Sequence, residues 1–394
     1  MATTSQHLLL SPAELAYLHS TLSLSPPLRP DGRTATQFRP LTAETGILPG
    51  TNGSARVCFA DGTEAVVGVK AEVEKTTRVG ILNEDESSRQ RRRKQARSHG
   101  AAKPTAITEE EDAEDGEAEA ASFSERRGEN DWLELSVEIP GYRDDDSGTV
   151  FLATMLSEAL LADGELTKKL WINRRFHWKL YLDIILISPP LSYPLPLLSL
   201  TSHLALLATR LPRLKSEGDE DPMFDDDWAA SQFIYARSGS ATTSTSTSRP
   251  PITLLVMAVG ENVIFDPSKE ELAVADCTLA VSVGEADVET DDAVAAKPGA
   301  RALRLLSVRT IDPPSRLTAP GVPNTVNAVA WGQGATTANE TGLRAAETGD
   351  VEGVWKAPRG GSKITLISTM VEKILEKGGV ADDVLEGLDG VELA

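Results

Sequence analysis

The chain has 394 residues, of which 40% are hydrophobic, so it can form the core of one large domain or of two medium ones. Its formal net charge of −20 argues against a broadly basic nucleic-acid-binding surface, because phosphate contacts depend on Lys and Arg. Two cysteines are too few for a disulfide framework, and the polar start at Met1–Gln6 predicts no signal peptide. No apolar run reaches the ~20 residues of a membrane span, so no membrane contact is expected.

The first predicted element is an amphipathic helix within residues 1–28. Ser11 and Glu14 have the spacing of a capping box, and the leucines that follow recur on one face. Two prolines at 26 and 27 are expected to end the helix before them. Its apolar face must pack either on its own domain or on a neighbouring subunit.

The most informative stretch follows the helix. A turn at 29–33 has the sequence RPDGR, and small residues, NGSA, stand at 52–55 where a strand is expected to begin. Asp61-Gly62 is a hairpin signal between two alternating apolar runs. We interpret Asp31 and Arg33 as a self-paired turn that fixes the entry to a sheet. The structural motif comprises Arg29, Asp31, Gly32, Arg33, Gly53 and Ser54.

The charge pattern then predicts a disordered insertion, and ordered strands and helices are expected after it. Residues 81–128 carry blocks of like charge and few apolar side chains, which is typical of a disordered insertion. The basic run at 91–94 fits either a nuclear localisation signal or a solvated segment. The elements expected afterwards are strands at 132–139 and 178–187, the latter buried on both faces, and helices at 149–162 and 197–209.

The second half is predicted to repeat strands followed by a helix. Residues 216–251 are acidic and then Ser/Thr-rich, as in a linker between a first domain at 29–215 and a second at 252–380. The second domain is expected to contain strands at 252–259, 262–265, 272–283 and 301–310, a helix at 363–377, and insertions at 284–299 and 332–353, before a C-terminal tail at 381–394.

The opening motif resembles the start of the RNase PH family, in which an R-x-DGR turn precedes a TG…GSA strand and a hairpin. The stretches at 52–57 and 67–73 are most similar to the non-catalytic branch of that family, which supplies ring subunits of the eukaryotic RNA exosome. This resemblance implies an α+β, RNase PH-like fold, with two β-α-β-α units around a shared core, similar to ribosomal protein S5 domain 2. It covers residues 28–79, 132–213 and 252–310, with a weaker match at 354–388.

Two features of active RNase PH members are missing from this chain. Their phosphate-binding GGTR loop corresponds here to residues 190–193, which read PLSY and lack both the glycines and the arginine. Their general acid belongs to a D-x-x-x-x-E-D pattern, of which Asp266 is present while Leu272 takes the place of the second Asp. We interpret Asp266 as a turn former and expect no catalytic residue.

Few basic residues are available to contact RNA outside the charged insertion. Arg174 and Arg175 precede the strand at 178–187, and we expect them near the loop at 190–193. For these two arginines, RNA contact and a solvated surface fit the sequence pattern equally well. The five histidines are scattered without metal-ligand spacing, so neither a metal nor a cofactor is predicted.

The resemblance implies a catalytically inactive, structural ring subunit that supports 3′-5′ RNA processing and degradation, including rRNA maturation. The implied partners are other RNase PH-like subunits in an obligate hetero-oligomer, S1/KH cap proteins, an exosome nuclease and RNA in a central channel. The implied location is the nucleus, with the nucleolus, and the cytoplasm. The alternatives are an active phosphate-dependent 3′-5′ exoribonuclease and a regulatory scaffold whose working part is the insertion at 82–128.

Overall fold

A computed structural model describes most of the chain outside the charged insertions. The insertions expected at 81–128 and 332–353 lie outside the described residues except for their last positions, as does the basic run at 91–94. The insertion expected at 284–299 is described only at its first two residues, which belong to a strand. The described residues are 10–76, 128–143, 145–216, 218–235, 249–285, 302–317, 321, 353–358 and 361–393.

The first half of the chain forms a five-stranded sheet of order β1-β2-β3-β5-β4. β4 and β5 run parallel, and the other neighbours are antiparallel. The hairpin predicted at Asp61-Gly62 is confirmed, with Gly62 at a φ of 85° between β2 and β3. The strands are β1 (Leu41–Thr45), β2 (Gly53–Phe59), β3 (Glu64–Lys75), β4 (Leu133–Glu138) and β5 (Phe176–Leu186).

β5 differs from the strand expected to be buried on both faces. Asp183 and Ile185 are exposed, while Leu182 and Ile184, which alternate with them, are fully buried. The sheet is antiparallel around β3 and β5, so helices need to cover one face alone.

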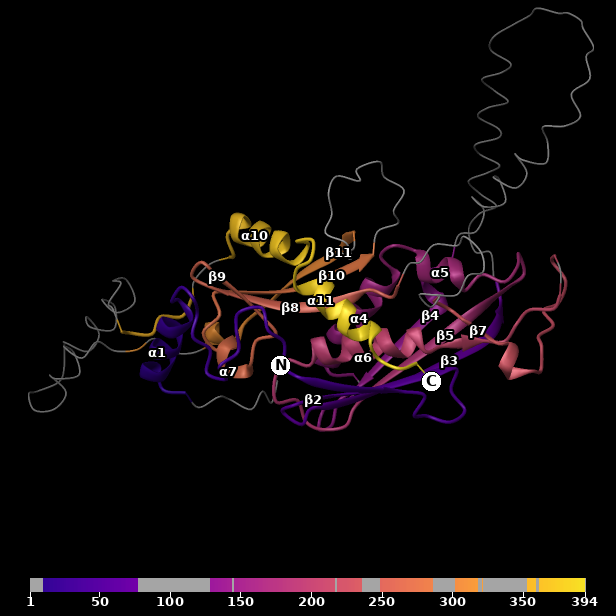
Figure 1. Ribbon diagram of the computed structural model, residues 1–394, viewed down its shortest axis with the longest axis horizontal. Helices are drawn as coiled ribbons and strands as arrows, with labels where there is room; N and C mark the ends of the chain where they lie inside the picture. Colours follow the sequence, from indigo (N-terminus) through magenta and orange to yellow (C-terminus); the bar gives the residue numbers. More distant parts are fainter. Residues whose placement is uncertain are drawn as a thin grey trace, which may run out of the picture.

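The second half forms a four-stranded antiparallel sheet of order β11-β10-β8-β9. Two helices, α4 (Ser147–Leu161) and α6 (Leu195–Leu207), lie between the two sheets (Figure 1). The predicted α+β class with a core shared by both halves is therefore confirmed. The strands are β8 (Ile252–Val259), β9 (Asn262–Phe265), β10 (Cys277–Glu285) and β11 (Leu303–Ile311).

Helix α6 is buried along its whole length because it has a sheet on each side. Its hydroxyl groups are satisfied internally: Thr201 and Ser202 donate to carbonyl oxygens four residues earlier, at 2.7 and 2.8 Å. Ser199 accepts the backbone N–H of Thr253 in β8 at 2.7 Å. The helix is thus bonded to the second sheet as well as packed on the first.

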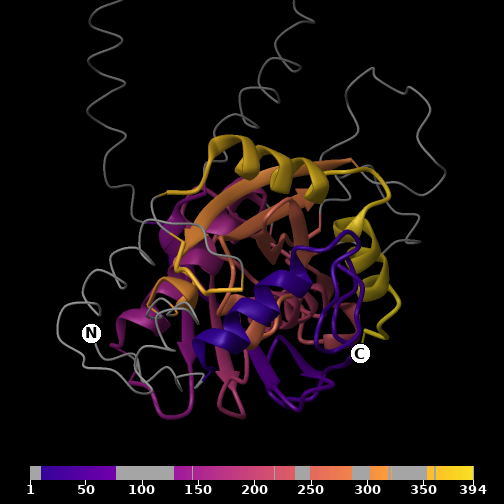
Figure 2. The same cartoon turned by 90° about the vertical axis from the view of Figure 1, so that its left-hand side faces the viewer.

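The N-terminal helix α1 (Pro12–Leu22) has the predicted capping box, with Glu14 N–H bonded to Ser11 Oγ and the Glu14 carboxylate bonded to Ser11 N–H. Its buried Leu15 and Leu22 pack with residues of β8 and β9, such as Met257. The apolar face of α1 therefore covers the second half of its own chain (Figure 2).

Part of the expected linker at 216–251 is ordered. β7 (Gln232–Phe233) pairs with β6 (Arg210–Leu211), and Leu214 bridges Phe224, whose ring lies 4.9 Å from that of Trp178. These apolar contacts hold a mainly acidic segment against the first sheet, which composition alone does not predict. Short helices in the described part are η1 (Asn130–Trp132), α5 (Glu165–Lys169), η2 (Trp228–Ala230), α7 (Lys269–Leu272) and η3 (Pro314–Leu317).

The C-terminal residues expected as a tail form α11 (Val380–Asp389) instead. Val380, Leu385 and Leu388 are buried in the shared core because they recur at helical spacing. α10 (Ile364–Ile374), near the predicted helix at 363–377, lies over the second sheet (Figure 2). The other domain boundaries stay a prediction. Every helix in the described part is too short or too polar to cross a lipid bilayer.

Candidate functional site

Three arginines of the opening motif converge on two carboxylates from the second half of the chain. Arg29 is 6% exposed, and Asp266 and Glu271 are fully buried. Arg33 and Arg39 approach from the same stretch, with side chains 8% and 10% exposed. We call these five residues the arginine–carboxylate cluster.

Asp266 lies directly after β9, where the chain turns with a φ of 46°. Its Oδ2 accepts from Arg33 Nη1 and Arg39 Nε, each at 2.9 Å, and its Oδ1 accepts from Arg39 Nη2 at 2.7 Å. A general acid must reach the group that it protonates. This carboxylate is enclosed and directed at guanidinium groups, so it serves as the anion of the cluster as well as forming the turn.

Glu271 makes the second connection of the cluster. Arg29 donates through Nε and Nη2 to the two carboxylate oxygens of Glu271, at 2.7 and 2.8 Å. Such a bidentate pair is among the strongest charged hydrogen-bond arrangements. The strand expected at 272–283 starts later, because Ser268 and Glu271 form a capping box that begins α7 and turns the carboxylate inward.

Asp31 and Arg33 lie side by side in the opening turn. Arg33 donates its backbone N–H to Asp31 Oδ1 at 3.1 Å, and its Nε is hydrogen-bonded to Oδ2. Burial raises the pKa of Asp31, but hydrogen bonds from Arg33 and the charge of Arg29 outweigh burial and hold that pKa below its ordinary value. Gly32 between them has a φ of 76°, a backbone conformation that favours glycine.

Gly53 and Ser54 begin β2 at its contact with α6. A Cβ on Gly53 would lie 2.6 Å from Thr209 Cα and 2.8 Å from the Ala205 carbonyl oxygen, so only glycine fits. Ser54 is buried, and its Oγ accepts the Leu48 N–H at 3.0 Å. Both residues have packing roles far from the cluster's ion pairs.

The loop at 190–193 lies beside the cluster and borders a small cavity. Pro190, Ser192 and Tyr193 line a cavity of about 10 Å³, which is about the volume that a single water molecule needs. Burial raises the pKa of Tyr193 to about 12. Helix α6 starts after Pro194, which has no N–H to donate to an anion.

Arg39 connects this loop to the cluster. Its Nη1 donates to Ser192 Oγ at 2.7 Å and to Asp61 Oδ2 at 2.6 Å, while its other nitrogens bind Asp266. Burial lowers the pKa of Arg39, but the hydrogen bonds and charges of Asp266 and Asp61 outweigh burial and raise it. A phosphate would have to compete with two carboxylates for this guanidinium group.

Arg174 and Arg175 lie at the opposite end of β5 from the loop at 190–193, so the expected proximity is wrong. The strand between them has 11 residues, which separates the two places by roughly 30 Å. The two arginines contact Asp219 and Asp221 instead. The segments before and after a single strand lie at its opposite ends, so closeness in sequence to the same strand does not bring them together.

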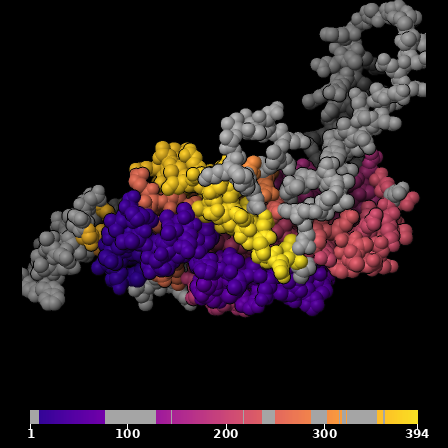
Figure 3. Space-filling view, viewed as in Figure 1, coloured from indigo at the N-terminus to yellow at the C-terminus, as the bar shows by residue number. Residues whose placement is uncertain are grey.

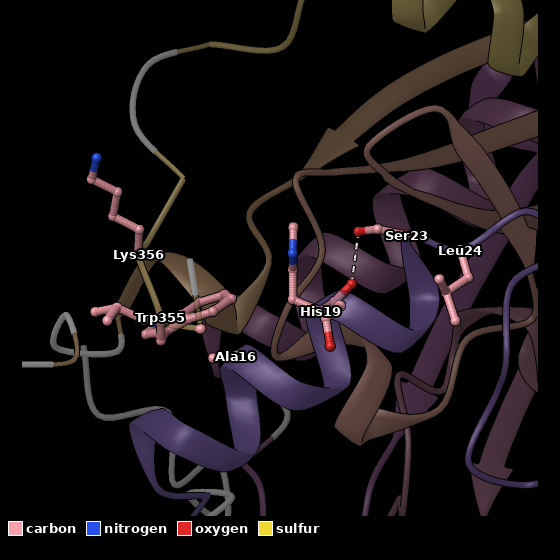
Figure 4. A pocket seen from close by; sticks show the side chains of 9 residues that line it. Ala16, His19, Ser23, Leu24, Trp355 and Lys356 are labelled. Atoms are coloured by element: carbon pink, nitrogen blue, oxygen red, sulfur yellow. Dashed lines mark hydrogen bonds between the residues drawn. The ribbon is translucent and has the colours of Figure 1, made fainter. Parts of the chain in front are cut away.

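A hollow lies between α1 and the segment at 353–358 (Figure 4). It has a volume of about 450 Å³ and is lined by His19, Leu24 and Trp355, among others. Among the described residues, no three His, Cys, Asp or Glu side chains are placed together to hold a metal ion.

Sequence reasoning missed most of the cluster's partners. It singled out Arg29 and Arg33 but did not pair Arg29 with Glu271, or Arg39 with Asp61 and Ser192. One signal was readable: Ser268 and Glu271 have capping-box spacing directly after Asp266. The pairings themselves join residues up to 242 positions apart, which no local pattern specifies.

The chain is similar to two yeast proteins, although no protein-family model matches it. It is 28% identical over 279 residues to exosome complex component RRP42 of Saccharomyces cerevisiae, covering 69% of this chain and 81% of the relative. It is 30% identical over 290 residues to exosome complex component rrp42 of Schizosaccharomyces pombe, covering 70% of this chain and 78% of the relative.

Solved structures with a similar arrangement include chains of an archaeal exosome core, of the Archaeoglobus fulgidus exosome with RNA bound to the active site, and of rice Rrp46. Their identities are 18%, 17% and 13%, and their TM-scores are 0.43, 0.42 and 0.37. They cover 75%, 75% and 72% of this chain and 84%, 86% and 85% of the solved chains.

Proposed function

This chain belongs to the family of exosome complex component RRP42, and we propose that it is a structural ring subunit of an RNA exosome that supports 3′-5′ RNA processing and degradation. The observation that carries the proposal is the match to both yeast relatives over more than three quarters of their length. The RNase PH-like opening motif at 29–33 and the shared core of two sheets agree with it.

We also propose that the chain has no phosphorolytic activity of its own. Support comes from the loop at 190–193, where the cavity is too small for phosphate and the nearest guanidinium group, that of Arg39, is neutralised by Asp61 and Asp266. Phosphorolysis needs both an anion site and an acid for the leaving group. The chain instead uses Asp266 to join its two halves.

The proposed partners are other RNase PH-like ring subunits, S1/KH cap proteins, an exosome nuclease and RNA in the central channel. The proposed location is the nucleus, including the nucleolus, and the cytoplasm. In this assembly the chain contributes subunit interface and channel wall, and rRNA maturation is among the processes that it supports. The RRP42 family membership supports these partners.

Native mass spectrometry of the tagged chain, purified from its own cells, tests the ring proposal. We expect a heteromeric assembly that contains several different RNase PH-like subunits and a nuclease. A homo-oligomer or a lone chain would contradict the proposal. The measurement reads subunit composition and does not depend on any activity of this chain.

A phosphorolysis assay on the purified full chain tests the proposed inactivity. With single-stranded RNA and inorganic phosphate, we expect no release of nucleoside diphosphates, and the Asp266→Asn variant should be equally inert. Phosphate-dependent release of nucleoside diphosphates by the wild-type chain would establish the alternative, an active exoribonuclease.

A further inference from the structure

The turn that leads into β5 presents two guanidinium groups on a fixed backbone. Asn173 is 3% exposed, and its Oδ1 accepts the N–H groups of Arg175 and Phe176 at 2.9 and 2.8 Å. The Arg175 guanidinium lies 5.4 Å from the centre of the Phe176 ring. The side chains of Arg174 and Arg175 are 59% and 56% exposed, so a buried amide holds the turn while the charges face solvent.

An acidic segment at 219–221 covers these two arginines. Asp219 Oδ1 accepts the backbone N–H of Arg174 at 3.2 Å, and Asp219 Oδ2 lies 3.8 Å from Arg174 Nε. Asp221 Oδ1 lies 3.0 Å from Arg175 Nη2, while Arg175 Nη1 donates to the Asp219 carbonyl oxygen at 3.4 Å. Each guanidinium group therefore faces a carboxylate of this segment.

The covering segment lies at the surface, at the end of the molecule away from α1 (Figure 3). It is attached to the turn through its backbone, because Asn173 Nδ2 donates to the Glu220 carbonyl oxygen at 2.9 Å. Further along, Phe224 packs on Trp178 at the start of β5. The segment thus has anchors that do not use the carboxylates of Asp219 and Asp221.

Arginine binds phosphate with the same bidentate geometry with which it binds carboxylate, and an RNA strand presents one negative charge per nucleotide. We propose that Arg174 and Arg175 form a binding site for the RNA phosphate backbone, and that the carboxylates of Asp219 and Asp221 occupy this site until RNA displaces them. This proposal rests on the proposed function, because the RNA is the one that the assembly processes.

Exposure makes such an exchange feasible. The four side chains are between 49% and 77% exposed, and ion pairs at exposed positions contribute little to stability and are screened by salt. Binding to RNA also releases counterions from the strand, which favours the displacement. The acidic segment therefore weakens RNA binding at this turn by competing for the two arginines, without blocking access to them.

Fluorescence anisotropy of labelled oligouridine, titrated with the full chain at several salt concentrations, tests the proposal. We expect the D219N/D221N variant to bind about fivefold more tightly than wild type, with a salt dependence steeper by about 1.4 in log–log slope. The matched control is E220Q/D226N, which removes the same net charge from nearby positions but leaves both arginine-facing carboxylates in place. Its affinity should stay within about twofold of wild type.

Three results decide the proposal. Equal affinities for D219N/D221N and E220Q/D226N would overturn it, as would a gain that persists when Arg174→Gln and Arg175→Gln are added. If D219N/D221N melts early, the single D221N variant, which breaks one exposed ion pair, should show a smaller gain that still requires Arg175. No gain in that variant would also overturn the proposal.

The proposed function and this inference are tested by separate measurements. Native mass spectrometry reads the subunit composition of the assembly, whereas anisotropy reads the affinity for RNA. An intact ring with no affinity gain would overturn the inference alone, and an affinity gain in a chain without ring partners would overturn the function alone.

Discussion

Arg29 and Glu271 form a fully buried bidentate ion pair across 242 positions of the chain, with both side chains completely shielded from solvent. Arg29 opens the N-terminal motif, and Glu271 lies on α7 of the second half. Arg29 also donates to the carbonyl oxygens of Phe265 and Asp266 at 3.2 and 3.0 Å. The opening motif is therefore a structural part of the second half, as α1 is.

The Arg29–Glu271 pair should show strong coupling in unfolding experiments. R29M or E271L alone leaves one buried charge without its partner and should lower the free energy of unfolding by about 3–5 kcal/mol. R29M should be the more damaging, because it also removes the hydrogen bonds that Arg29 donates to the carbonyl oxygens of Phe265 and Asp266.

The double variant R29M/E271L should cost well below the sum of the two single changes, since no charge is stranded. Urea denaturation of all four proteins measures the coupling free energy. Additive single effects would show that the two side chains are held by other groups.

Asp266 should be needed for stability. Asp266→Asn keeps the shape but removes the charge that faces Arg33 and Arg39, so we expect a loss of about 3–5 kcal/mol in the free energy of unfolding. Asp312→Asn is the control, because Asp312 has a side chain 92% exposed and should change stability by about 0.5 kcal/mol at most. A variant as stable as wild type would mean that the cluster carries no stabilising charge.

Gly53 should not tolerate a side chain. Gly53→Ala puts a Cβ against Thr209 and the Ala205 carbonyl oxygen, and forcing β2 away from α6 should cost about 1–3 kcal/mol. Gly148→Ala in α4 is the matched control, since a Cβ there meets nothing within 4 Å, and it should stabilise the helix by up to about 1 kcal/mol. Thermal unfolding measures the melting temperatures of both variants. Equal melting temperatures would contradict the close approach of β2 to α6 at Gly53.

Asp61 should contribute to stability at neutral pH and lose that contribution in acid. Burial raises the pKa of Asp61, but hydrogen bonds from Thr63 and the charge of Arg39 outweigh burial, so the pKa lies below its ordinary value of 3.8. Because the unfolded chain binds the proton first, the contribution is complete above about pH 4 and falls as pH drops through the folded-state pKa.

The Asp61→Asn variant should therefore be less stable than wild type at pH 7, and the difference should shrink below about pH 3. Urea midpoints at the two pH values measure it. A difference that stays constant with pH would show that Asp61 acts through its shape and not through its charge. Asp312→Asn, at an exposed position, again serves as the control.

Local signals determined the elements of this protein. The capping box at Ser11 and Glu14 specified the start of α1, and Asp61-Gly62 specified the β2–β3 hairpin. Runs of apolar residues specified the strands of both sheets other than β1, whose sequence LTAET has no such run. These features depend on neighbours a few positions away, so the chain order alone is enough. The RNase PH-like motif at 29–33 likewise indicated the family without any coordinates.

Tertiary structure alone decided which charges meet. The pairing of Arg29 with Glu271, the enclosure of Asp266 and the contact of Asp219 with Arg174 depend on how two sheets and their helices pack. An arginine can pair with any carboxylate that folding brings within reach, and the periodicity of the sequence does not indicate which carboxylate that is. For the same reason the amphipathic pattern of α1 left its partner open until packing placed it on the second half of its own chain.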